Sequence, residues 1–159
     1  MTALPRLTVS RHALETVQEL AHGGDERTLT ARGLYLTSME ARRALAALGR
    51  DLNGGTGTRW TQTVHLAIAQ GLIPVTRSAD IALPYWQLDL LRAYACGLSL
   101  DMYAGIAPLP VNDARELNVL LLTRLVAKNE QHAVLRGHET GALRIDDPLE
   151  VTFGEALNT

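Results

Sequence analysis

Apolar residues recur along this chain mainly at helical spacing, and several of the segments they mark end at glycine. A first helix is predicted over residues 8–21, where a glycine pair follows. Residues 25–34 are polar and are predicted to form a connection. Because helical spacing of apolar residues and glycines at segment ends are both typical of helical proteins, the pattern favours a mainly α fold.

A second helix is predicted over residues 39–48. Thr37 and Glu40 have the spacing of a capping box, in which each side chain accepts from the other residue's amide. Gly49 is predicted to close this helix. The Gly-rich residues that follow, up to Thr58, contain no apolar side chain to hold them beyond Leu52 and are predicted to form a loop.

The next helix is predicted over residues 59–70, with Gly71 as the left-handed residue after it. One stripe of this helix is apolar and is predicted to be buried: Trp60, Val64, Ala67 and Ile68.

Two short strands are predicted beyond Gly71. Residues 72–75 are β-branched and interrupted by proline, which suits an edge strand, and residues 81–83 are expected to return beside them. Pro84 then begins a helix that ends at Gly97.

The last third of the chain is dominated by a long periodic segment. Residues 98–111 fit no single element, and Asn112 is predicted to cap a helix over residues 114–136. The tail contains residues 143–145 and 149–153, which are expected to pair as a small hairpin.

The order of elements over residues 35–91 is helix, turn, helix, strand, turn, strand, helix. Residues 63–77, TVHLAIAQGLIPVTR, carry a Thr-Val pair in the helix, a glycine that ends it, an Ile-Pro pair and then an arginine. This stretch resembles the winged helix-turn-helix of MerR-type regulators and phage excisionases. The connection at residues 49–58 is longer than the roughly three or four residues usual in that motif. The resemblance implies a mainly α fold with a β-hairpin wing that binds double-stranded DNA.

The resemblance also implies which side chains would meet DNA. The helix at residues 59–70 would enter the major groove, and its predicted exposed residues are Arg59, Thr61, Gln62 and His65. Arginine suits the guanine edge and glutamine the adenine edge, because each can form two hydrogen bonds there. Phosphate contacts are expected from the wing and the preceding helix, at Arg77, Arg42 and Arg43. For each of these residues the alternative is an ordinary solvated side chain.

The distribution of charge agrees with one basic end. The net charge is −2, but residues 1–78 carry nine arginines and six acids, whereas residues 79–159 carry six basic residues and eleven acids. A basic half suits contact with phosphate, although an imbalance of this size is also ordinary scatter.

The expected organisation has three parts. Residues 1–34 form an N-terminal helix and connection, residues 35–97 the DNA-binding domain, and residues 98–159 a helical interaction region. The last part contains a leucine stripe formed by Leu117, Leu121 and Leu125, which predicts a homodimer. The alternative is that this stripe packs on the protein's own N-terminal domain.

Other chemistry has little support in the sequence. The histidines lack metal-ligand spacing, the single cysteine suits a reducing compartment, and no apolar run is long enough to span a membrane. We therefore expect a cytoplasmic, nucleoid-associated, non-enzymatic DNA-binding protein without a cofactor. The rival is a protein-interaction module that uses the winged-helix shape without binding DNA, and a weaker third class is a small helical hydrolase using His132.

Overall fold

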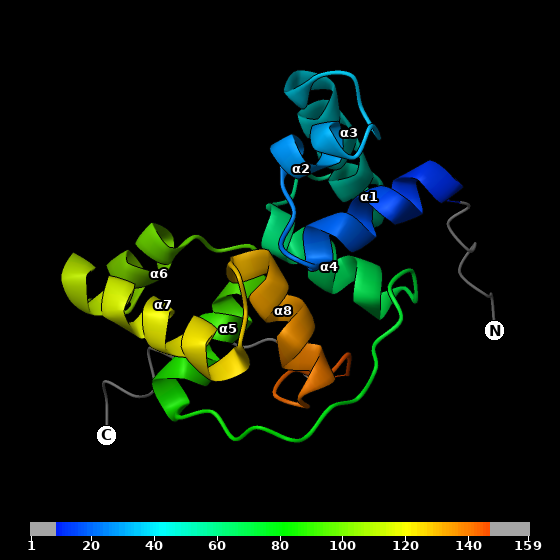
Figure 1. The fold of residues 1–159 in the computed structure, drawn as a ribbon. Helices are drawn as coiled ribbons and strands as arrows, with labels where there is room; N and C mark the ends of the chain where they lie inside the picture. Colours follow the sequence, from blue (N-terminus) through cyan, green and yellow to red (C-terminus); the bar gives the residue numbers. More distant parts are fainter. Residues whose placement is uncertain (1–8, 147–159) are drawn as a thin grey trace.

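A computed structural model shows the chain as an assembly of packed α-helices (Figure 1). It describes residues 9–146, in which eight helices and no β-strand are found. In chain order the helices are α1 (Arg11–Ala21), α2 (Glu26–Ala31), α3 (Ser38–Leu52), α4 (Trp60–Ala69), α5 (Tyr85–Ala95), α6 (Leu100–Ile106), α7 (Val111–Leu125) and α8 (Glu130–Glu139). The expected mainly α class is confirmed.

Helices α4 and α8 pack against each other at the centre of the molecule. The helices α1, α2 and α3 lie on one side of this pair and α5, α6 and α7 on the other (Figure 1). Helix α4 also contacts α1, α3 and α5, while α8 also contacts α1, α5 and α7. One buried apolar cluster, which includes Val17, Val64 and Leu135, therefore draws residues from all three predicted segments of the chain.

Local capping explains most of the helix boundaries. The Thr37 hydroxyl accepts from the Glu40 amide at 3.1 Å, which confirms the predicted start of α3. Gly71 and Gly97 have φ of +76° and +91°, a conformation that favours glycine and ends α4 and α5. Helix α2 was not predicted, although Asp25 forms a capping box with Thr28 at its start.

The predicted β-hairpin wing is wrong. Residues 72–84 include no strand and instead pass beside the C-terminal end of α8 (Figure 1). The Ser78 amide donates to the Glu139 carbonyl at 2.8 Å, and the Ile81 amide donates to the Thr140 carbonyl at 3.4 Å. The last carbonyls of a helix have no partner within it, so α8 supplies the acceptors that a second strand would have supplied.

Helix α3 continues past Gly49, contrary to the prediction that this glycine ends it. A Cβ atom at Gly49 would collide with the Thr58 hydroxyl oxygen. The glycine therefore allows the loop before α4 to pack closely against the helix.

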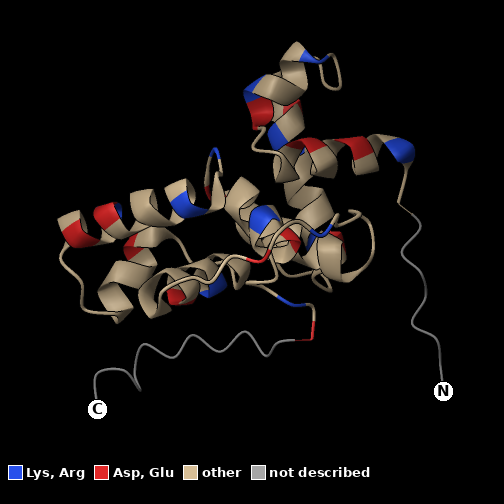
Figure 2. Cartoon of the chain, turned by 60° about the horizontal axis from the view of Figure 1, so that its bottom comes forward, with Lys and Arg blue, Asp and Glu red and all other residues tan. Residues whose placement is uncertain are grey.

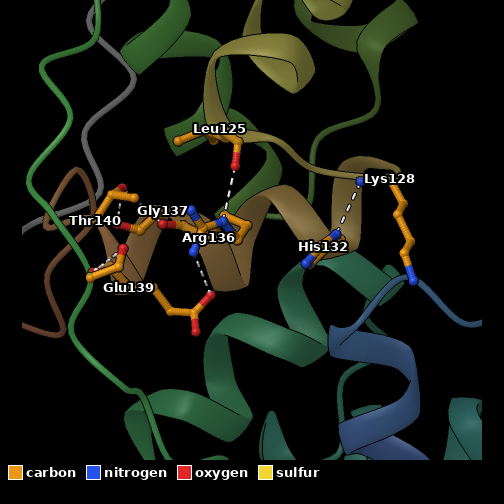
Figure 3. Close-up of polar contacts among 8 residues, drawn as sticks. Leu125, Lys128, His132, Arg136, Gly137, Glu139 and Thr140 are labelled. Carbon is orange, nitrogen blue, oxygen red and sulfur yellow. Dashed lines mark hydrogen bonds and ion pairs between the residues drawn. The ribbon is translucent and has the colours of Figure 1, made fainter.

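The long helix predicted over residues 114–136 is two helices, α7 and α8. The break lies at Val126, whose φ of 55° and ψ of 47° are left-handed. Figure 3 shows how the Arg136 side chain closes the break: its Nε donates to the Leu125 carbonyl at 2.9 Å, and its Nη1 pairs with Glu139 at 3.2 Å. The start of α7 also differs, because Pro110 occupies the cap position predicted for Asn112.

Two further predictions concern the C-terminal end and the membrane. Residues 143–146 are not in a strand, while residues 149–153 of the predicted hairpin lie outside the described residues. None of the helices in residues 9–146 has the length and apolar character needed to cross a membrane.

Candidate functional site

The helix predicted to read DNA is enclosed by other helices. Thr61 and His65, which were predicted to be exposed, have only 9% and 8% of their surface exposed. Gln62 is half-buried, and its Oε1 lies 2.5 Å from where a Cβ on Gly97 would be. Of the predicted base-contacting residues only Arg59, just before the helix, is exposed. Because helices α1, α3, α5 and α8 cover α4, its polar side chains cannot enter a major groove in this structure, and the prediction of an exposed reading face is wrong.

His65 instead forms a buried contact with His138 of α8. The His65 Nδ1 and His138 Nε2 atoms are 2.9 Å apart, and the two rings stack with centroids 5.1 Å apart. Burial lowers the pKa of both imidazoles, to about 4 for His138, whose neighbour His65 adds to the effect. Both rings are therefore neutral at pH 7, with one nitrogen donating and the other accepting.

The arginines predicted to contact phosphate differ in their surroundings. Arg77 pairs with Asp80 at 2.7 Å, and Arg42 pairs with Glu26 at 3.1 Å. Arg43 is exposed and has no ion pair within residues 9–146. Figure 2 shows Lys and Arg interspersed with Asp and Glu along the helices.

The leucines predicted to form a dimer seam belong mainly to the core. Leu121 and Leu125 are fully buried within the chain, and Leu117 is half-buried. The alternative of packing within the same chain therefore holds for Leu121 and Leu125, and the predicted seam is wrong for them.

Helix α7 presents a different set of residues outward. Asp113, Glu116, Leu120 and Arg124 follow at intervals of three or four residues, which places them on one face of the helix. Leu120 remains 50% exposed at the centre of this set. We call these four residues the α7 stripe. The spacing of the stripe can be read from the sequence. It was missed because only one of its residues is apolar, and the more regular leucines of the same helix suggested a different face.

A shallow apolar groove runs beside the α7 stripe. Its floor is formed by Trp86, Leu109 and Leu117, and its rim includes Asp113, Glu116 and Leu120 of the stripe. Exposed apolar residues with a charged rim are typical of protein-binding surfaces.

A larger cleft lies where α4 and α8 begin. It has a volume of about 490 Å³ and is lined by residues from four separated segments: Thr58, Arg59, Trp60, Thr61, Tyr94, Leu98, Ser99, Leu100, Glu130 and Gln131. Burial raises the pKa of the Tyr94 hydroxyl, and the nearby Glu130 carboxylate adds to this rise. Because the segments are far apart in the chain, no local sequence pattern identifies this cleft.

Thr61 lines this cleft, but its hydroxyl is buried behind the cleft surface and unsatisfied. Its Oγ1 is buried and has no hydrogen-bond partner among the described residues, a condition that costs roughly 1–3 kcal/mol. Thr61→Val, which keeps the shape and removes the hydroxyl, is expected to stabilise the isolated protein by about 1 kcal/mol.

Thermal unfolding followed by circular dichroism would measure this change. Thr63→Val is the matched control, because the Thr63 hydroxyl bonds Thr58 at 2.7 Å and the Arg59 carbonyl at 3.1 Å. The control is expected to lower the melting temperature. A lower melting temperature for Thr61→Val as well would show that its hydroxyl is satisfied in solution.

No group of three or more His, Cys, Asp or Glu side chains suited to a metal ion is found within residues 9–146. Comparison with protein families, with curated proteins and with solved structures finds no match to this chain.

Proposed function

We propose that this chain is a protein-interaction module that acts as a homodimer through the α7 stripe. The observation that carries the proposal is the order of side chains along the stripe. Asp113 and Glu116 lie at its start, Leu120 at its centre and Arg124 near its end. A two-fold axis at Leu120 would set the acidic end of each copy against the basic end of the other.

The surroundings of the stripe support this pairing. The groove floor of Trp86, Leu109 and Leu117 offers apolar surface for the Leu120 side chain of a second copy. Arg124 donates to the Ala82 carbonyl at 3.2 Å but has no ion pair within the described residues, so its charge remains available to an acidic partner. Burial of the central leucine would supply affinity, while the charges would fix the antiparallel orientation.

Leu120→Glu is expected to weaken dimerisation by at least about tenfold, because it places a charge at the centre of the contact. Sedimentation equilibrium over a concentration series would measure the dissociation constant. Leu36→Glu is the control, since Leu36 is 88% exposed and precedes α3, away from the stripe.

Charge reversal tests the orientation separately. Glu116→Arg and Arg124→Glu are each expected to weaken the dimer, and the double substitution is expected to restore it. A wild-type protein that remains monomeric at every concentration would rule out the proposed function, whereas a dimer insensitive to all these substitutions would place its interface elsewhere.

DNA binding is the second candidate, through α3 in place of α4. Arg43 and Arg50 lie seven residues apart on one exposed face of α3, and neither has an ion pair within residues 9–146. Ala46 and Ala47 lie between them and are exposed, so the helix surface there is low enough for both guanidinium groups to approach a phosphate backbone.

The double substitution Arg43→Gln with Arg50→Gln is expected to weaken binding to mixed genomic fragments about tenfold at low salt. It is also expected to reduce the slope of log K against log salt concentration by about two, because two phosphate contacts are lost. Fluorescence anisotropy over a salt series would measure both. Arg115→Gln with Arg144→Gln, which removes two exposed arginines elsewhere, is the control. Equal losses in the two variants, or no binding by the wild type at low salt, would exclude this candidate.

A further inference from the structure

We propose that the cleft at the beginning of α4 and α8 binds a small zwitterion with an amino and a carboxylate group, such as an amino acid or a short peptide. This inference is independent of the α7 stripe, because the cleft is lined by other residues. Its basis is a pair of opposite charges and an apolar wall within one cavity.

The carboxylate end is defined by the start of α4. Arg59 lines the cleft, is exposed and forms no ion pair with any described residue. No side chain caps α4, so the amides of its first turn have no partner within the helix or from a capping residue. These amides and the helix dipole favour an anion beside the Arg59 guanidinium.

The amino end is defined by the start of α8. Glu130 lines the same cleft, is half-buried and also forms no ion pair among the described residues. One unpaired cation and one unpaired anion match a ligand that carries one charge of each sign. A nucleotide would bring several negative charges toward Glu130 and is therefore disfavoured.

The remaining wall suits a ligand with an apolar part. Trp60, Leu98 and Leu100 provide apolar surface, and the volume of about 490 Å³ exceeds that needed for a single amino acid side chain.

Saturation-transfer NMR on the full chain would test the proposal, with a mixture of the protein-forming L-amino acids and L-alanyl-L-alanine as probes. At least one probe is expected to show saturable transfer. Arg59→Gln and Glu130→Gln are each expected to weaken its binding at least about tenfold, because each removes a charge-assisted contact. Arg50→Gln and Asp51→Asn, which alter neighbouring exposed charges on α3 outside the cleft, are expected to leave binding unchanged.

Analogues of the responding probe separate the two ends of the ligand. The amine without the carboxylate and the acid without the amino group are each expected to bind at least about tenfold more weakly than the zwitterion. Equal binding of the acid and the zwitterion, displacement by inorganic phosphate at comparable concentration, or no response to any probe would overturn the proposal. Circular dichroism of each variant would confirm that the fold is retained.

Discussion

The free energy of unfolding is expected to fall by about 3 kcal/mol as the pH is lowered from 7 to about 4, because protonation opposes the buried contact between His65 and His138. The folded-state pKa of His138 is about 4, below the value of 6.5 expected for an unfolded chain. Between these values the unfolded chain binds a proton that the folded chain does not. Stability is therefore fully present above pH 6.5 and is lost progressively toward pH 4.

The geometry explains why protonation is unfavourable. The two rings pack between α4 and α8, and the hydrogen bond of 2.9 Å needs an acceptor nitrogen on one of them. Burial is the main cause of the lowered pKa at both residues, and at His138 the other imidazole is the only further cause. The pKa of the half-buried His132 is also lowered, first by burial, so this residue contributes in the same direction.

Urea unfolding at a series of pH values would measure the expected slope. Replacing both partners, His65→Leu with His138→Leu, is expected to leave stability at pH 7 nearly unchanged and to remove most of the pH dependence, because no polar atom of the pair is left without a partner. His12→Gln is the control, since His12 is exposed and lies outside this contact. A double variant as acid-sensitive as the wild type would mean that carboxyl groups, and not the histidine pair, cause the loss.

Most of the helices could be predicted from local features of the sequence. The Thr37 cap and the glycines after α4 and α5 are short-range features, and they place three helices nearly at their observed boundaries. Local features also mislead where a residue has two uses. Gly49 looks like a helix end, but its lack of a Cβ serves the close approach of Thr58 within α3.

The environment of each helix was harder to predict than its existence. A stripe with Trp60, Val64 and Ile68 identifies one buried face of α4, but it does not show that the opposite face is also covered. Thr61 and His65 looked exposed because they are polar, whereas the structure buries them and gives His65 a polar partner 73 residues away. A pairing at that distance in the chain has no local signature, and neither has the cleft that joins α4 to α8.

The break between α7 and α8 was missed for a related reason. Val126 is β-branched and follows the apolar pattern of α7, so its left-handed conformation contradicts its local preference. The conformation is held by contacts from the next helix, where Arg136 reaches back to the Leu125 carbonyl. The sequence pattern therefore merged two helices that tertiary contacts separate.

Gly137→Val is expected to destabilise the protein by about 3 kcal/mol, the upper part of the range for overpacking a core. Gly137 lies inside α8 where the helix meets α5. A Cβ there would lie 2.8 Å from Leu91 Cδ2 and 3.0 Å from Leu143 Cδ1, and both leucines are buried. Because both leucines belong to the buried cluster, they can make room for the added methyl groups only by displacing their own neighbours.

A matched helical glycine separates this steric effect from helix propensity. Gly105 lies in α6, is exposed, and has no atom within 4 Å of its Cβ position. Gly105→Val is expected to change stability by less than about 0.5 kcal/mol, because both substitutions alter the backbone preference alike and only one meets the core. Denaturant unfolding of the two variants would give the difference directly. Equal stabilities would mean that α8 can shift relative to α5 at little cost.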